Sequence, residues 1–280
     1  MPKHSTDPTR WQLEAIWQAV EPTLRGFTCE LLPEVDSTNS ELMRRFKDGH
    51  TEPTLLVAEQ QTAGRGRLGR QWHSERGDSL TFSLGMLLSP AAWSGLSLAV
   101  GVSLAESLDP AFAAKRHIAL KWPNDLWLAG RAGVEQKLAG VLIETAAWEG
   151  TRYAVVGVGL NIRAVGLPKG RPAAVPPGHL QSLLPEIDAA AALLRVVPPL
   201  VQTVQAFSEF GFEPFQARFA KRDVLANRNV ELSDGQHGQA HGVNMNGGLL
   251  VHTESGMQVV ATSEISVRPA AGHAGTGGER

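Results

Sequence analysis

Cysteine, charge of one sign and long apolar runs are all scarce in this chain of 280 residues. Cys29 is the single cysteine, so a disulfide framework or a multi-cysteine metal cluster is excluded, and a reducing, cytoplasmic setting fits. The net charge of −2 lacks the basic excess typical of general nucleic-acid binding. No run of about 18 apolar residues occurs, so we expect no membrane span and no membrane partner. The polar start MPKHSTDPTRWQ lacks the apolar core of a signal peptide.

Apolar periodicity predicts an α+β fold, with a mixed, largely antiparallel sheet flanked by helices. The predicted helices cover residues 7–20, 38–49, 95–108 and 188–222. Asp7 with Pro8 caps the first helix, and a capping box of Thr38 and Glu41 begins the second. The last helix is predicted to break at Pro198–Pro199. The predicted strands cover residues 27–35, 54–61, 79–87, 118–121, 125–128, 137–147 and 152–162, with turns at 130–133 and 149–150. Residues 163–185, rich in proline and glycine, are predicted to form a long surface loop.

The character of the chain changes after Asn227. Short β-like runs at 229–232, 239–243, 248–252 and 257–265 are separated by Asp-Gly, Asn-Gly and Ser-Gly pairs, which favour hairpins. We therefore predict a catalytic domain over residues 1–226 and a small C-terminal β-barrel over 227–268. The barrel is too small for much of a core, so it should pack on the first domain. A disordered, glycine-rich tail is predicted over 269–280.

The most informative stretch is the loop 61–70, QTAGRGRLGR. Gly64, Gly66 and Gly69 match the G-x-G-x-x-G spacing after a strand. However, no helical pattern follows and three arginines fall within six residues, so we reject a dinucleotide-binding interpretation. Glycines let the backbone approach a ligand, and arginines make forked contacts to carboxylate or phosphate. An anion site is favoured, although a solvated basic turn or a nucleic-acid patch would have the same composition.

Three further clusters carry weaker signals. In KWPND (121–125), Asn124 and Asp125 offer oxygen ligands for Mg²⁺ beside nucleotide phosphates, but taken alone an aspartate turn between strands is the simpler interpretation. In KLAG, Lys137 begins an apolar strand beside a glycine, which is unusual for a plain strand start, yet edge lysines are common. In GVGLN (157–161), glycines inside a strand indicate close approach of a ligand or another backbone.

Taken together and in this order, these sequence motifs resemble those of the biotin protein ligases. The resemblance runs from about residue 34 to residue 162, more loosely to residue 266, and rests on DSTN (36–39), Gln61 with GRGR (64–67), KWPND, KLAG and GVGLN. It implies the class II synthetase-like catalytic fold shared by biotin and lipoate ligases, with an SH3-like C-terminal barrel. The implied activity uses ATP and Mg²⁺ to activate biotin as biotinyl-5′-AMP. Biotin is then transferred to a lysine of the biotin carboxyl carrier domain of a carboxylase.

The resemblance also implies roles for individual residues. Ser37, Thr38 and Gln61 would hydrogen-bond the biotin ureido ring, and residues 65–67 would cradle the biotin carboxylate and adenylate phosphate in a loop that orders on ligand binding. Lys137 would meet the carboxylate and the α-phosphate. The expected catalytic residues are Arg65 and Lys137, and the candidate Mg²⁺ ligand is Asp125. The expected biotin- and adenylate-binding residues are Ser37, Thr38, Asn39, Gln61, Gly64, Arg65, Gly66, Arg67, Trp72, Asn124, Lys137, Gly140 and Asn161.

Two other functions share part of this signature. Ligases of this family that also repress transcription carry an N-terminal helix-turn-helix domain. Too few residues precede the first expected catalytic strand to form one here, so we expect the monofunctional type without a DNA partner. The nearest alternative enzyme is a lipoate ligase, and KWPND with the arginine-dense loop favours biotin instead. A biotin-responsive DNA regulator is the alternative binding protein. A homodimer is compatible with the sequence.

Overall fold

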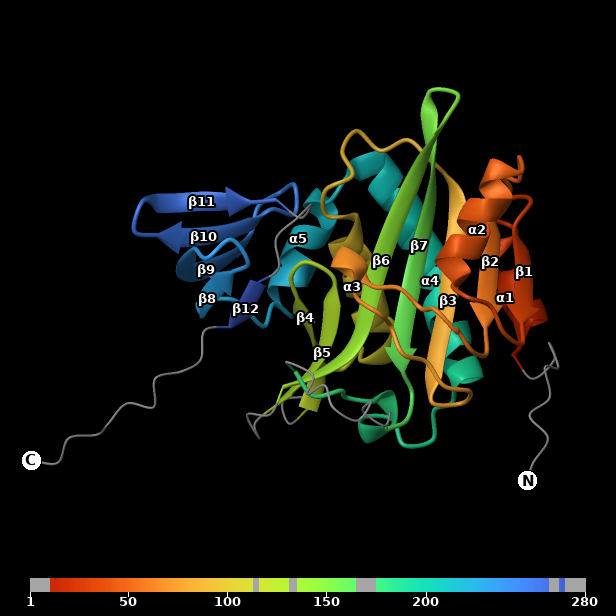
Figure 1. Ribbon diagram of the computed structural model, residues 1–280, viewed down its shortest axis with the longest axis horizontal. Helices are drawn as coiled ribbons and strands as arrows, with labels where there is room; N and C mark the ends of the chain where they lie inside the picture. The colour runs from red at the N-terminus through yellow and green to blue at the C-terminus, as the bar shows by residue number, and fades with distance from the viewer. Residues whose placement is uncertain (1–10, 113–115, 131–134, 165–174, 262–266, 270–280) are drawn as a thin grey trace, which may run out of the picture.

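The computed structural model describes residues 11–112, 116–130, 135–164, 175–261 and 267–269, which form two sheets with helices on the larger one (Figure 1). The larger sheet has the order β1-β2-β3-β7-β6-β5-β4, and its strands are β1 (Thr28–Leu32), β2 (Thr54–Ala58), β3 (Ser79–Leu88), β4 (Arg116–Lys121), β5 (Asp125–Gly130), β6 (Gln136–Trp148) and β7 (Thr151–Asn161). β1 and β2 are parallel and the other neighbouring strands are antiparallel. The predicted mixed, largely antiparallel sheet is therefore confirmed.

Successive side chains of a strand point to opposite faces of the sheet, and the two faces of this sheet carry different kinds of residue. One face presents large apolar side chains such as Phe82, Val156 and Leu160, which form the main core with α3 (Leu96–Leu108) and α4 (Ala189–Phe210). The other face carries a stretch of small residues, where Ser83 pairs with Gly157 and Gly140 pairs with Gly159. The apolar face stabilises the fold, and the small-residue face leaves room for a ligand.

α2 (Thr38–Lys47) covers part of the small-residue face, opposite α3 and α4 (Figure 1). Its Leu42 and Phe46 form a second core cluster with Tyr153 and Val155, and the Phe46 and Tyr153 rings stack at 4.9 Å between centroids. The cluster holds the helix from Leu42 onward. Its N-terminal turn therefore reaches the glycine-rich part of the sheet.

The N-terminus of α2 differs from the predicted capping box by one residue. Ser37 is the N-cap, and its hydroxyl accepts from the Ser40 amide at 3.4 Å. Thr38 instead bonds to Gln61, and Glu41 pairs with arginines of its own helix. The prediction was wrong because both Ser37 and Thr38 are good caps, and only tertiary contacts decide between them. α1 (Leu13–Val20) was also predicted, but Asp7 and Pro8 lie outside the described residues.

The helix break predicted at Pro198–Pro199 is absent, since α4 runs continuously through both prolines. A proline removes the hydrogen bond to the carbonyl four residues earlier, which here belongs to Leu194 and Arg195. Arg195 is exposed and Leu194 is half-buried, so these carbonyls lie on the outer side of the helix, where water can satisfy them. The opposite side, with Leu193, Val197 and Leu200, is fully buried. Packing of this face outweighs the local cost of the prolines.

α4 is also long and apolar enough to cross a membrane by length and composition alone. Its apolar side chains lie in the core, where it packs against α1, α3 and β3. These contacts identify α4 as a buried core helix of this fold, which explains its composition without a membrane.

The C-terminal sheet has the order β11-β10-β9-β8-β12, with β8 (Asn229–Leu232), β9 (His237–Val243), β10 (Leu249–Thr253), β11 (Gly256–Val260) and β12 (Val267–Pro269). Pro269 pairs with Val230, so the last strand includes a residue that we assigned to the tail. The small β domain is confirmed, whereas its closure as a barrel and the boundary at residue 226 stay predictions. The rest of the predicted tail lies outside the described residues.

The C-terminal domain packs on the first one, as predicted. The Trp122 indole donates to the Gly247 carbonyl at 3.1 Å, and Gln216 of α5 (Glu213–Ala220) donates to the Val243 carbonyl at 2.7 Å. At the same contact a side-chain carbon at Gly247 would lie 2.6 Å from the Gly95 Cα. The two backbones therefore meet directly, next to the start of α3.

Candidate active site

A cavity of about 140 Å³ lies on the small-residue face of the larger sheet. It is enclosed by the N-terminus of α2, the glycine–arginine loop and the adjoining ends of β4, β5 and β6. It brings together most of the predicted site: Ser37, Thr38, Asn39, Gln61, Arg65, Gly66, Arg67, Trp72, Asn124, Asp125, Lys137 and Gly140. The lining residues that we had not assigned to the site are Leu68, Arg70, Gln71, Lys121, Pro123, Val141, Leu142, Gly157, Val158 and Gly159.

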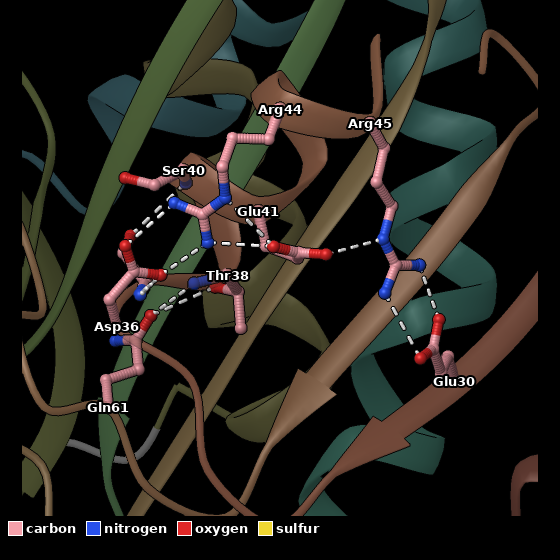
Figure 2. A network of polar contacts seen from close by, with 9 residues as sticks. Glu30, Asp36, Thr38, Ser40, Glu41, Arg44, Arg45 and Gln61 are labelled. Atoms are coloured by element: carbon pink, nitrogen blue, oxygen red, sulfur yellow. Dashed lines mark hydrogen bonds and ion pairs between the residues drawn. The ribbon is translucent and has the colours of Figure 1, made fainter. Parts of the chain in front are cut away.

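Ion pairs hold the N-terminal turn of α2 in place (Figure 2). Arg44 makes a forked contact to Asp36 at 2.7 and 2.8 Å and also contacts Glu41, while Arg45 joins Glu41 to Glu30. The hydrogen bond from Arg44 is the main reason why the pKa of Asp36 falls to about 2. Asp36 in turn accepts from the amide of the next residue at 2.7 Å. The turn that carries the cavity residues 37–39 is therefore fixed from outside.

Inside the cavity, polar side chains of this turn are already connected to one another. The Gln61 carbonyl oxygen accepts from the Thr38 amide at 2.7 Å and from its hydroxyl at 3.2 Å. The fully buried Ser83 hydroxyl lies 2.6 Å from both Thr38 Oγ1 and Asn39 Oδ1. Asn39 sits over Gly157, where any side chain would collide with its amide. Ser83 was missed because a lone serine within an apolar strand has no distinctive sequence signal.

The glycine–arginine loop forms a small hairpin rather than the start of an α-helix. The Trp72 amide donates to the Gly64 carbonyl at 2.8 Å, the Gly66 amide donates to Arg70 at 2.7 Å, and residues 67–69 form a single 3₁₀ turn. The next element is β3, which confirms that this is no dinucleotide fingerprint. Gly64 itself is outside the cavity lining, and a side chain there would collide with the Trp72 carbonyl. Its role in this structure is to close the hairpin.

The Trp72 ring packs against the glycines of β6 and β7. A Cβ at Gly159 would lie 2.7 Å from Trp72 Cζ2, and one at Gly140 would lie 3.6 Å from the same ring system. The Lys137 Nζ is 5.9 Å from the ring centroid. The indole nitrogen is buried and has no hydrogen-bond partner in the described part of the chain. The glycines of GVGLN therefore admit the side chains of Trp72 and Asn39, and both also line the cavity, where the predicted close approach of a ligand stays a prediction.

Positive charge dominates the other end of the cavity. Arg67, Arg70, Lys121 and Lys137 line it, and Asp125 is the one acidic side chain among its described lining residues. Asp125 pairs with Lys137 at 2.6 Å. Burial lowers the pKa of the half-buried Arg67 and lowers that of Lys121, which is 8% exposed, to about 8. An excess of desolvated cations is a site for an anion. The place of Lys121 in the cavity was not predicted, because only Asn124 and Asp125 of the KWPND motif were considered as ligands.

The donor set does not fit a resident Mg²⁺ site, although Asp125 was our candidate ligand. Mg²⁺ prefers octahedral oxygen coordination, usually with one or two carboxylates. Here the nearest cation to Asp125 is Lys137, and the Asn124 side-chain oxygen lies 3.5 Å from an Arg67 nitrogen. No group of three or more histidine, cysteine, aspartate or glutamate side chains that could hold a metal ion occurs among the described residues. The structure gives Asp125 the role of counter-ion to Lys137.

The side-chain amides of Asn161 and Asn124 donate hydrogen bonds to backbone carbonyls near the cavity. The Asn161 amide is buried, lies outside the cavity lining and donates to the Gly178 and Lys137 carbonyls at 3.0 and 3.4 Å. The Lys137 amide donates to the Pro176 carbonyl at 2.9 Å. Asn124 lines the cavity and donates to the Val141 carbonyl at 2.7 Å. In this structure Asn161 supports the Lys137 backbone, and part of the predicted surface loop 163–185 serves the same purpose. A contact between Asn161 and a ligand stays a prediction.

Comparison with known proteins gives a consistent picture. The model of the Biotin/lipoate A/B protein ligase family matches residues 31–161. The bifunctional ligase/repressor BirA of Escherichia coli strain K12 is 33% identical over 255 residues, which cover 88% of this chain and 76% of that protein. The biotin–[acetyl-CoA-carboxylase] ligase of Paracoccus denitrificans is 28% identical over 246 residues, 84% of this chain and 98% of that protein.

Solved structures agree with these sequence matches. The biotin protein ligase from Aquifex aeolicus in complex with biotin and ATP superposes with a TM-score of 0.71 at 30% identity, covering 87% of this chain and 99% of that one. The predicted fold class is thereby confirmed. The chain matches the family model, is 33% identical to a ligase of which it covers 76%, and shares the fold of a biotin protein ligase. It therefore belongs to the biotin/lipoate A/B protein ligase family, with biotin protein ligases as its relatives.

Proposed function

We propose that this chain activates biotin with ATP to biotinyl-5′-AMP and transfers the biotin to a lysine of a biotin carboxyl carrier domain. The observation that carries this proposal is a cavity with two chemically different ends. The turn of α2 and Gln61 offer neutral hydrogen-bonding groups suited to a ureido ring, and the opposite end offers Arg67, Lys121 and Lys137. An uncharged polar head and an acid group joined to a phosphate match these two ends.

In the first step, a biotin carboxylate oxygen forms a bond to the α-phosphorus of ATP while the bond to the leaving pyrophosphate breaks. Two unit negative charges at about 4 Å repel by roughly 4 kcal/mol at an effective dielectric near 20. Positioned cations remove this barrier and stabilise the additional charge of the transition state. Lys137 and Arg67 are the proposed source of this stabilisation, with Arg65 held at the rim. Mg²⁺ would enter with the phosphates of ATP as part of the substrate.

In the second step, the amine of the carrier lysine attacks the acyl carbon, and AMP leaves with the electrons of the broken C–O bond. A lysine with a pKa near 10.4 is neutral in fewer than about one molecule in a thousand at neutral pH. The attacking amine must therefore lose its proton near the cavity, where Asp125 is our candidate to help. The mixed anhydride must also be kept from water. The hairpin 64–72, lying along the cavity, is the proposed cover.

Lys121 should give adenylate binding a pH dependence. Its pKa of about 8 means that it is mostly protonated at pH 7 and loses its charge as the pH rises through 8. An anionic ligand favours the protonated form, so we expect the affinity to fall by up to about tenfold per pH unit above 8. The measurement is calorimetric binding of an unreactive phosphodiester analogue of biotinyl-AMP at pH 7, 8 and 9. Lys121→Met should bind about tenfold more weakly at pH 7 and show a flat profile. A profile as steep as that of the wild type would show that another group titrates.

The proposed function is tested by incubating the protein with ATP, Mg²⁺, biotin and a carrier domain. We expect pyrophosphate release together with a mass gain of one biotinyl group on the carrier. A carrier whose acceptor lysine is replaced by arginine should support adenylate formation but gain no mass. Lipoate offered instead of biotin should react poorly. Preferential transfer of lipoate would assign the chain to the lipoate branch of its family, and no adenylate with either acid would refute the proposal.

The carrier domain of acetyl-CoA carboxylase or a related carboxylase is the proposed acceptor. Support comes from the Paracoccus denitrificans relative, which is named as a biotin–[acetyl-CoA-carboxylase] ligase.

A further inference from the structure

Glu144 lies outside the cavity lining but contacts two residues that belong to it. It stands on β6, in the same alternation as Gly140 and Leu142, and its side chain is 26% exposed. Its carboxylate accepts from the Asn39 amide nitrogen at 2.9 Å and forms an ion pair with Arg65. Arg65 lines the cavity while it makes this pair. Glu144 therefore joins the arginine loop to the first turn of α2.

This contact completes a circuit of polar contacts that closes through the polypeptide between Gln61 and Arg65. From Asn39 the circuit continues through the Ser83 hydroxyl to Thr38, and from Thr38 to Gln61. Gln61 lies only four residues before Arg65 in the chain. The arginine loop is thus attached at its beginning through Gln61 and within the hairpin through Arg65. Both attachments end on the same turn of α2.

The circuit has little freedom to rearrange. Ser83 is fully buried, and Thr38 and Asn39 are each 3% exposed. Asn39 also rests on the backbone of Gly157. The Arg65 side chain is 46% exposed, but the carboxylate that it contacts is held by the buried Asn39. A charge-assisted contact to a fixed carboxylate orients a guanidinium more strongly than a contact between two mobile side chains does. Glu144 is the one member of the circuit that carries a negative charge, so it is the member on which the position of Arg65 depends.

We propose that Glu144 is a positioning residue for the ligase reaction: it holds Arg65 at the cavity and couples the arginine loop to the biotin-side residues Thr38 and Gln61. This inference rests on the proposed function for its catalytic consequence. Biotin bound at Thr38 and Gln61 would then stabilise the same circuit that keeps the loop closed over the adenylate. Loss of Glu144 should release the loop without removing any cavity-lining side chain.

The test compares Glu144→Gln with Arg65→Ala, the double variant and the control Glu106→Gln. The glutamine amide oxygen can still accept from Asn39, so Glu144→Gln removes the ion pair and preserves the fold. Glu106 pairs with Arg218 between α3 and α5, away from the cavity, and provides the same charge change. Two readouts are measured: trypsin cleavage within the loop at Arg65, Arg67 or Arg70 in the free protein, and the time for which the enzyme retains biotinyl-AMP.

We expect Glu144→Gln to speed trypsin cleavage of the loop about tenfold and to shorten adenylate retention by a similar factor, a typical coupling for contacting residues. In the Arg65→Ala background the same change should have less than about a twofold further effect on retention, because the two residues act as a unit. Glu106→Gln should match the wild type in both readouts. Wild-type trypsin resistance in Glu144→Gln, or equal losses of retention in both backgrounds, would overturn the proposal. If the wild type formed no adenylate, the proposed function would fail while the trypsin readout still decided the role of Glu144.

Discussion

Replacing Lys137 with methionine is expected to lower the rate of biotinyl-AMP formation by roughly 10²- to 10³-fold, the usual cost of removing a preorganised group that stabilises transition-state charge. The Lys137 ammonium lines the cavity, 2.6 Å from the Asp125 carboxylate. The substitution removes one cation and leaves Asp125 without this partner, so both changes disfavour a ligand with two anionic groups. The measurement is pyrophosphate release at saturating ATP and biotin.

Two further variants separate the causes of this loss. Lys47→Met removes a lysine from the exposed end of α2 and should leave the rate unchanged. Adding Asp125→Asn to Lys137→Met removes the unpaired carboxylate, and any recovery measures its repulsion of the ligand. If Lys137→Met kept more than a third of the wild-type rate, Lys137 would not be a catalytic residue, and the positive end of the cavity would depend on Arg67 and Lys121.

Gly159→Ala should weaken biotin binding by roughly 10- to 100-fold, because small displacements of groups that shape a site are costly. The new methyl carbon would lie 2.7 Å from Trp72 Cζ2, so the ring must move into the cavity. The same overpacking should lower the free energy of unfolding by about 1–3 kcal/mol. Calorimetric titration with biotin and chemical denaturation measure the two effects.

Gly140→Ala is the matched control for stability at a paired strand position. A Cβ there has its nearest neighbours at 3.6 Å, an ordinary contact, so unfolding should be nearly unaffected. Trp72→Phe should restore part of the stability of Gly159→Ala, since the smaller ring leaves space for the methyl group. If Gly159→Ala binds biotin like the wild type, Trp72 does not help to shape the biotin site.

The sequence was informative where chemistry and local pattern coincide. Glycine next to arginine, and lysine at the start of an apolar strand, are poor choices for a core and therefore indicate a ligand. The strands were predictable because alternation on β3, β6 and β7 separates a large apolar face from a small one. These signals are local, and they were sufficient to locate most of the cavity lining.

Tertiary contacts decided what local patterns could not. Nothing near Asn161 in the sequence distinguishes an amide that contacts a ligand from one that supports the Lys137 backbone. The prolines of α4 are tolerated because of what the opposite side of the helix buries, and the cap of α2 depends on the distant Gln61. Ser83 and Glu144 were missed for the same reason, because their partners are far along the chain.

The contact between Trp122 and Gly247 changes how the two domains should be regarded. Trp122 is fully buried, and it is the residue between Lys121 and the Pro123–Asp125 turn. Its indole N–H donates to the Gly247 carbonyl, at the tip of a hairpin in the other domain. A substitution at that tip, 125 residues further along the chain, is therefore expected to disturb the packing of Trp122, the neighbour of the cavity residues Lys121 and Pro123. The small domain therefore supports, from outside the cavity, the end of β4 that carries Lys121 and leads into the Pro123–Asp125 turn.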